Sequence, residues 1–308
     1  MSKFHNILRL NVLVIFLMIF ILQGTAAARD LTGYKQILWQ HLEAICAIGP
    51  RPPGSPGLAK LRDYIKAVGS RYADEVREQA FTFQKAGRPA VSMVNIELVF
   101  HGKSRKAPML LGAHYDTRPF ADEESDFYSR QFPILGANDG GSGTAVLLAL
   151  AQYFHEHKPE RPVRLVFFDG EDYGVKFSND YFLGAKHYAA QLQQVERGEW
   201  PYGVLIIDMV GDRELQIARE TYSSENASWL LKIIFESAEK LKAAPFYSPP
   251  KYTVRDDHLP FIKIGIPAAV LIDFDYPYWH TLADTLDKCS AESMFTVFLV
   301  VVDAMGKI

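Results

Sequence analysis

The stretch Val163-Arg-Leu-Val-Phe-Phe-Asp-Gly-Glu-Asp172 joins an apolar run to two neighbouring carboxylates. The run over residues 163–168 is rich in apolar and β-branched side chains, which indicates a strand buried on both faces. Glu171 and Asp172 follow shortly after its end. Because ligands in open α/β sheets gather outside the carboxyl ends of the strands, these two acids predict a functional site there.

Similar runs recur along the chain, and helical patterns separate most of them. The other candidate strands cover residues 92–100, 108–113, 204–207 and 268–272. The helical patterns cover residues 31–45, 56–69, 143–157, 185–194, 227–242 and 291–305. This alternation predicts an α/β fold, a three-layer sandwich in which helices flank a mainly parallel or mixed central β-sheet. The sequence contains no internal repeat and no linker, so we expect residues 29–308 to form a single catalytic domain.

The composition is that of an ordinary globular protein, and it argues against one class of partner. The 308 residues carry a net charge of −3, so the basic excess of a nucleic-acid binder is missing. Lysines and arginines are also dispersed rather than clustered. We therefore expect no nucleic-acid partner.

The first 28 residues have the order of a secretory signal peptide. Lys3 and Arg9 precede an apolar run over residues 10–22, and small residues from Thr25 lead to a cleavage site after Ala28. The run is short for a membrane span, which needs roughly 20 apolar residues. We expect a secreted or periplasmic protein with no stable membrane span after cleavage; an uncleaved anchor is the alternative.

Cys46 and Cys289 are the only cysteines of the chain. One disulfide would suit an exported protein. Two separate buried thiols would suit it equally, because Cys46 lies on the apolar face of a predicted helix. Both alternatives stay open, as does the oligomeric state.

Short motifs bring carboxylates and imidazoles to the ends of the candidate strands: His114-Tyr-Asp116, Asn138-Asp139-Gly-Gly-Ser142, Gly170-Glu-Asp172, Asp208, and Trp279-His280-Thr281. Because they follow strands of one sheet, we expect them to converge. A catalytic zinc usually has three His, Asp or Glu ligands and one open position. Asp139, Asp172 and His280 make a suitable trio, and the Gly140-Gly141 pair would let backbone approach closely.

Glu171 is expected to differ in role from its neighbour Asp172. Adjacent residues in an extended or turn segment point in different directions. Asp172 can therefore bind the metal while Glu171 faces the substrate as a general base or proton shuttle.

A second metal position is one of two alternatives for the remaining motif residues. His114 and Asp208 could complete it with Asp139 bridging, or could form a hydrogen-bonded network around a single zinc. Asp116, two residues after His114, could orient that imidazole.

Aromatic residues and a further acidic segment stand near the last motif. Trp279 and Tyr276 could form the walls of a substrate pocket beside His280, or could pack in the core. Asp256-Asp257-His258 could cap a helix or stand at the site. The sequence has no nucleophile elbow, phosphate-binding loop or His-Glu-x-x-His helix, so the motifs together predict zinc hydrolase chemistry.

In this order, the motifs resemble those of the zinc aminopeptidase family that also contains the animal-type glutaminyl cyclases. The resemblance runs from Gly49-Pro-Arg-Pro-Pro-Gly-Ser55 to Trp279-His280-Thr-Leu-Ala-Asp284. Trp279 and the segment Asp256-Asp-His-Leu-Pro-Phe261 are similar to the cyclase branch. The segment Thr117-Arg-Pro-Phe-Ala-Asp122 resembles bacterial members of that branch.

The resemblance implies a glutaminyl-peptide cyclotransferase, which converts the N-terminal glutamine of a peptide or protein to pyroglutamate and releases ammonia. It implies one zinc ion on the trio and a proton shuttle at Glu171. Asp208 and Asp256 would share the hydrogen-bond network of that glutamate. Phe177 stands where animal cyclases carry a pocket tryptophan, so it is a candidate substrate contact.

Two other functions remain as alternatives. An aminopeptidase of the same family would use two zinc ions, held by His114, Asp139, Asp172, Asp208 and His280. A metal-free binding ectodomain is the least favoured reading, because the candidate ligands are intact.

Overall fold

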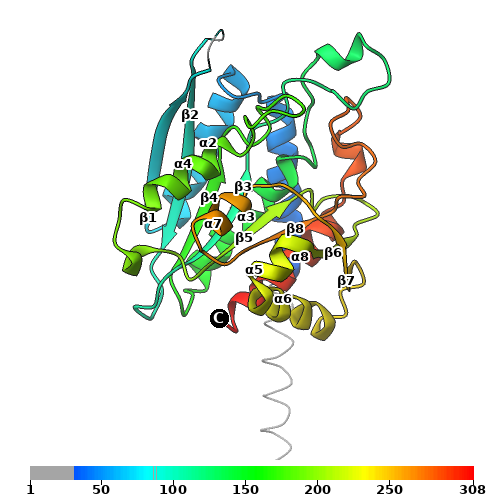
Figure 1. Ribbon diagram of the computed structural model, residues 1–308. Coiled ribbons are helices and arrows are strands. Elements are labelled where there is room, and N and C mark those ends of the chain that lie inside the picture. The colour runs from blue at the N-terminus through cyan, green and yellow to red at the C-terminus, as the bar shows by residue number, and fades with distance from the viewer. Residues whose placement is uncertain (1–30, 86, 88) are drawn as a thin grey trace, which may run out of the picture.

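A six-stranded mixed sheet forms the centre of the protein, as the computed structural model shows for residues 31–85, 87 and 89–308 (Figure 1). Its strand order is β1-β2-β4-β3-β5-β8. The pairs β3–β4, β3–β5 and β5–β8 are parallel, and β1–β2 and β2–β4 are antiparallel. The expected signal peptide over residues 1–28 lies outside the described residues.

The strands and helices alternate along most of the chain. The strands are β1 (Glu75–Phe83), β2 (Val91–Phe100), β3 (Met109–His114), β4 (Val163–Phe168), β5 (Gly203–Asp208), β6 (Ile217–Glu220), β7 (Phe246–Tyr252) and β8 (Ala268–Ile272). A helix over residues 31–48 precedes α2 (Pro56–Tyr72), α3 (Gly141–Glu156), α4 (Leu183–Leu192), α5 (Thr221–Asn226), α6 (Ser228–Lys240), α7 (Leu259–Lys263) and α8 (Ala291–Met305).

Two apolar clusters, one on each face of the sheet, make the sandwich three layers thick (Figure 1). Alternate strand residues point to opposite faces, so Leu205 of β5 joins one cluster and Ile206 joins the other. The helix over residues 31–48, α2, α3, α6 and α8 cover the first face. α4 and α7 cover the second face. The predicted fold class is confirmed.

Some elements were not predicted because their sequences lack a clear apolar pattern. β1 reads Glu-Val-Arg-Glu-Gln-Ala-Phe-Thr-Phe and is at most half-buried, as suits an edge strand. β6 and β7 form a separate two-stranded parallel sheet, and β7 contains Pro249-Pro250. Proline removes a ladder hydrogen bond, so such a segment does not read as a strand.

α3 begins at Gly141, the second glycine of the Asn-Asp-Gly-Gly motif, and packs tightly on the sheet. A Cβ atom on Gly140, whose φ is 77°, would lie 2.4 Å from the carbonyl oxygen of Asp116. A Cβ atom on Gly143 would lie 2.2 Å from the carbonyl oxygen of Ile207 in β5. The expectation that glycine permits close backbone approach here is confirmed, and it fixes the start of α3 next to the strand ends.

Cys46 and Cys289 are free thiols in this structure, and both belong to or pack against the first apolar cluster. Within the described residues, no helix has the length and apolar character that a membrane crossing requires.

We predict that Gly143→Ala lowers the free energy of unfolding by about 1–3 kcal/mol, because the added methyl group collides with the β5 backbone. Gly33→Ala is the matched control, since the same substitution in the helix over residues 31–48 meets no atom within 4 Å. Urea unfolding followed by circular dichroism measures both. Equal stabilities of Gly143→Ala and the wild type would contradict the tight contact.

Candidate metal centre

The carboxyl ends of three neighbouring parallel strands meet at one edge of the sheet and carry the predicted motifs. His114 is the last residue of β3, and Asp208 is the last residue of β5. Glu171 and Asp172 follow β4. The motifs converge in space because β3 lies between β4 and β5.

Asp139, Asp172 and His280 form a compact buried group. Each offers one ligand atom, and these atoms lie within 4.8 Å of one another. The Nε2 atom of His280 lies 3.2 Å from Oδ1 of Asp172 and 3.6 Å from Oδ2 of Asp139. All three side chains are at most 5% exposed. The trio is therefore a geometrically suitable metal site.

His280 is oriented by a second ring contact that the sequence motifs did not reveal. Its Nδ1 atom lies 3.2 Å from Oδ1 of Asp122. The Arg118 guanidinium donates two hydrogen bonds to Asp122, at 2.7 and 2.6 Å. The same guanidinium donates to the backbone carbonyls of Asp172 and Gly174. A carboxylate that orients a ligand histidine in this way strengthens its hold on a metal.

Asp116 fastens the acidic pair to the end of β3. Its two carboxylate oxygens accept the backbone N–H groups of Glu171 and Asp172 at 3.1 and 3.2 Å. Its Oδ1 atom also lies 3.6 Å from Nδ1 of His114. Asp116 thus connects the His-Tyr-Asp motif to the Gly-Glu-Asp motif.

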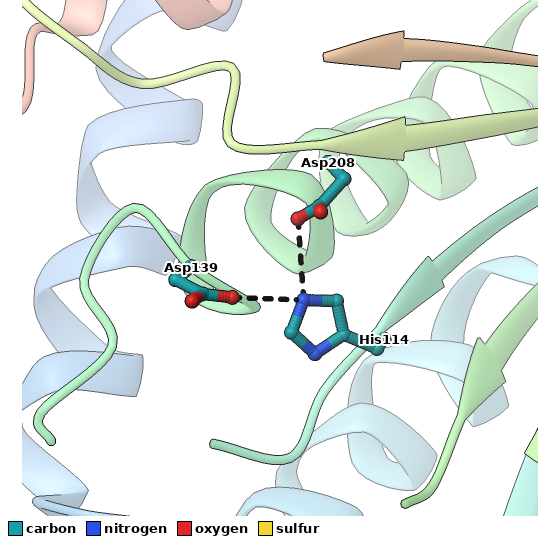
Figure 2. Close-up of side chains that lie close together, drawn as sticks. All are labelled: His114, Asp139 and Asp208. Carbon is teal, nitrogen blue, oxygen red and sulfur yellow. Dashed lines mark hydrogen bonds and ion pairs between the residues drawn. The ribbon is translucent and has the colours of Figure 1, made fainter. Parts of the chain in front are cut away.

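His114 lies between two carboxylates, as Figure 2 shows. Its Nε2 atom is 3.1 Å from Oδ1 of Asp139 and 3.2 Å from Oδ1 of Asp208. His114, Asp139 and Asp208 also form a group that could hold a metal ion. The geometry is thus compatible with both a second metal position and a hydrogen-bonded network.

A cavity of about 210 Å³ opens beside the trio. Asp139, Asp172 and His280 line it together with Glu171, Asp208, Asp256 and Trp279. The Trp279 ring stacks on His280 with ring centroids 3.9 Å apart. The tryptophan is therefore an apolar wall beside the candidate metal.

Two expected substrate contacts, Phe177 and Tyr276, are not among the residues that line this cavity. Phe177 is fully exposed and has a φ of 66°. Tyr276 is buried, and its hydroxyl donates to Oδ1 of Asp284 at 2.7 Å. Asp284 in turn accepts the backbone N–H groups of Asn138 and Asp139. Tyr276 therefore supports the loop that carries a trio residue.

Within the segment Asp256-Asp257-His258, Asp256 stands at the cavity, and no side chain of the segment caps α7. His258 is the N-cap residue of α7, but no side-chain hydrogen bond accompanies it. All three residues are at most 2% exposed, and Asp256 lines the cavity. The side-chain cap, one of the two expected alternatives, is absent, and of the three residues Asp256 alone reaches the cavity.

Burial and mutual charge push the pKa values of the neighbouring acids apart. Burial, and then the charge of Asp172, raise the pKa of Glu171 well above its ordinary value. Burial also opposes ionisation of Asp172, but His280 and Arg118 outweigh it and hold the pKa of Asp172 below its ordinary value. Burial and Asp172 raise the pKa of Asp139 to about 7. Pairs of acids with separated pKa values are typical of sites that divide proton transfer from charge stabilisation.

Three residues that line the cavity adopt left-handed backbone conformations that are uncommon for residues other than glycine, and Phe182, with a φ of 58°, is one of them. Met209, directly after Asp208, has a φ of 44°, and His280 has a φ of 55°. Such conformations cost about 1–3 kcal/mol each and concentrate at functional sites.

The fold and the site together define an α/β protein with a buried His/Asp/Glu centre at the carboxyl edge of its sheet. The sequence model of peptidase family M28 matches residues 95–305, and the chain belongs to this family. The predicted resemblance to the family of zinc aminopeptidases and glutaminyl cyclases is confirmed.

Solved structures and a curated relative place both activities among similar proteins. The glutaminyl cyclase of Fimbriiglobus ruber has a TM-score of 0.83 and 31% identity, covering 88% of this chain and 94% of that chain. A leucine aminopeptidase precursor from Bacteroides thetaiotaomicron has a TM-score of 0.83 and 26% identity, covering 89% and 97%. The glutaminyl-peptide cyclotransferase of Boiga irregularis is 26% identical over 294 residues, covering 82% of this chain and 76% of that protein.

We predict that Asp122→Asn weakens zinc binding by about 10–100-fold, because the His280 ring loses the charged group that orients it. Competition with a chromophoric chelator measures the affinity. Asp126→Asn, in the same loop but exposed, is the matched control and should bind zinc as the wild type does. Equal affinities of the two variants would rule out the orienting role of Asp122.

Proposed function

We propose that the protein is a zinc-dependent glutaminyl-peptide cyclotransferase, which converts the N-terminal glutamine of a peptide or protein to pyroglutamate and releases ammonia. One observation carries the proposal: a small cavity is lined by the trio, by Trp279 stacked on His280, and by Glu171 outside the trio. Similarity to the cyclases of Fimbriiglobus ruber and Boiga irregularis supports it.

Asp139, Asp172 and His280 would hold one zinc ion per chain. Two carboxylates and an imidazole are ligands that catalytic zinc takes. The Oδ2 atoms of Asp139 and Asp172 are buried without a hydrogen-bond partner among the described residues. Buried polar atoms rarely lack a partner unless a ligand or an ion completes them. When bound, zinc would supply Lewis-acid polarisation of the glutamine side-chain carbonyl.

Glu171 would move the proton that the reaction transfers. The α-amine nitrogen bonds to the side-chain carbonyl carbon, and the bond from that carbon to the amide nitrogen breaks. One amine proton must therefore travel to the departing nitrogen, which leaves as ammonia. Glu171 takes this proton and returns it, and its raised pKa favours the protonated form between the two transfers.

Asp208 and Asp256 would hold the proton-transfer network in place. Both line the same cavity as Glu171. After burial and Asp172, the charge of Asp256 is among the groups that raise the pKa of Glu171. The network would keep the proton near Glu171 between its two transfers.

A two-zinc aminopeptidase that hydrolyses N-terminal residues is the second candidate function. The group His114, Asp139 and Asp208 favours it, because it could hold another ion beside the trio. A metal-free binding ectodomain is a third and weaker candidate, since both groups keep their full set of ligand atoms.

We also propose that the protein is exported. Residues 1–28 would be removed as a signal peptide, and residues 29–308 would form the mature catalytic domain in the periplasm or outside the cell. Peptides or proteins with an N-terminal glutamine would be the partners there. The order of charge, apolar run and small residues over this segment supports the proposal.

We predict that the purified protein holds about one zinc ion per chain and releases ammonia, but no free amino acid, from glutaminyl peptides. Metal analysis and paired assays of ammonia and amino acids measure this. Two zinc ions with release of N-terminal residues would establish the aminopeptidase instead. Absence of both zinc and turnover would favour the binding ectodomain.

We predict that Glu171→Gln lowers turnover by about 10²–10⁴-fold while the zinc content stays unchanged, because the amide cannot carry the proton. Glu236→Gln, on the far side of the sheet in α6, is the matched control. Substantial activity of Glu171→Gln would remove Glu171 as the proton shuttle.

A further inference from the structure

A groove between α4 and α7 adjoins the cavity of the candidate metal centre. Phe182 and Arg255 line both the cavity and the groove, so the two are continuous. The floor of the groove is apolar and includes Ala189 and Pro260. A segment bound in the cavity could therefore extend along the groove.

Three exposed cations line this groove. Lys186 belongs to α4, Lys263 ends α7, and Arg255 stands at the junction with the cavity. None of the residues that line the groove carries a carboxylate. Across the part of the chain that the structure describes, no ion pair joins any of these three cations to an acid.

The cations of the groove influence one another rather than being neutralised. Burial, and then the charges of Arg255 and Lys263, lower the pKa of Lys186. Asp180 and Asp257 oppose this effect, Asp180 more strongly, and Asp180 already pairs with Lys85. The Lys186 ammonium donates to the carbonyl oxygen of Asn179 and lies 5.6 Å from the Phe182 ring centroid. An anion could thus approach all three cations without displacing an existing ion pair.

The balance of charge changes between the cavity and the groove. Six acids line the cavity, and the lysine that also lines it, Lys176, pairs with Glu123, whereas the charged residues of the groove are all cations. A ligand complementary to both parts has an amine at one end and acidic side chains a short distance along its chain.

We propose that the groove between α4 and α7 binds the residues that follow the N-terminal glutamine and selects substrates with acidic side chains there. This inference rests on the proposed cyclase function and adds its substrate class. Arg255 stands closest to the cavity and contacts the side chain next to the glutamine. Lys186 and Lys263 contact the side chains that follow, while the apolar floor packs against the peptide backbone.

The test compares three peptides with capped carboxyl ends: Gln-Ala-Ala-Ala-amide, Gln-Glu-Glu-Ala-amide and Gln-Lys-Lys-Ala-amide. We expect kcat/KM of the zinc-loaded wild type to be roughly tenfold higher for the acidic peptide than for the basic one, mainly through KM. High salt should reduce this ratio, because exposed charges are screened. A ratio within twofold of one would overturn the proposal.

Charge reversal identifies the residues responsible. In the double variant Lys186→Glu/Lys263→Glu the ratio should fall below one, because the groove then repels acidic side chains. Lys232→Glu, an exposed lysine of α6 on the other face of the sheet, is the matched control and should keep the wild-type ratio. An unchanged ratio in the double variant would remove the groove as the source of selectivity.

Failure of the cyclase proposal is separable from failure of the groove proposal. If the wild type releases no ammonia from any of the three peptides, the cyclase function is wrong. Fluorescence anisotropy with carboxyl-terminally labelled acidic and basic peptides then tests, independently of turnover, whether the groove prefers acidic peptides. If the wild type binds the acidic peptide more tightly and the double variant does not, the proposed selectivity of the groove is supported. Equal binding of the two peptides by the wild type overturns it.

Discussion

The burial of negative charge at one edge of the sheet is the constraint on which the rest of the structure depends. Buried carboxylates are costly unless they are paired, hydrogen-bonded or bound to a metal. Several buried carboxylates are stabilised by partners of this kind. Arg118 pairs with Asp122 and contacts Asp172. Backbone N–H groups donate hydrogen bonds to Asp116 and Asp284. The acids that line the cavity therefore stay in fixed positions, and a cation is the group that would complete them.

Most strands and helices of the central sandwich, and the grouping of Asp139, Asp172 and His280, could be predicted because their signals are local. An apolar run such as residues 163–168 reads as a buried strand by itself, and an acid after it is at once a candidate ligand. Contacts between distant segments could not be predicted in this way. Asp122 contacts His280 across a separation of 158 positions in the sequence. Tyr276 was expected at the pocket, but the fold places its hydroxyl against Asp284. The edge strand β1 was missed because one side of an edge faces solvent.

Cyclisation and hydrolysis have different catalytic requirements, which the same residues would have to meet. Cyclisation brings together two groups of one glutamine, so the site must orient the amine and polarise one carbonyl. Hydrolysis also needs an activated water, which a second metal helps to supply. His114 is only 1% exposed and is not among the residues that line the cavity, while Asp139 and Asp208 are. The contacts of His114 with both acids can therefore fix the positions of Asp139 and Asp208. Cyclisation requires these fixed positions whether or not a second ion is present.

The segment that leads into α7 joins the chemistry to the choice of substrate. Arg255 and Asp256 are adjacent, so their side chains diverge: Asp256 is buried in the cavity and Arg255 is exposed at the rim. A few residues later Lys263 ends the helix that forms one side of the groove. Because one short segment carries both the buried acid and the exposed cations, a change in its position would alter proton transfer and peptide binding together. Phe261 of α7 packs against Phe168 and Tyr188 in the second apolar cluster, so this segment is anchored to the core of the sandwich.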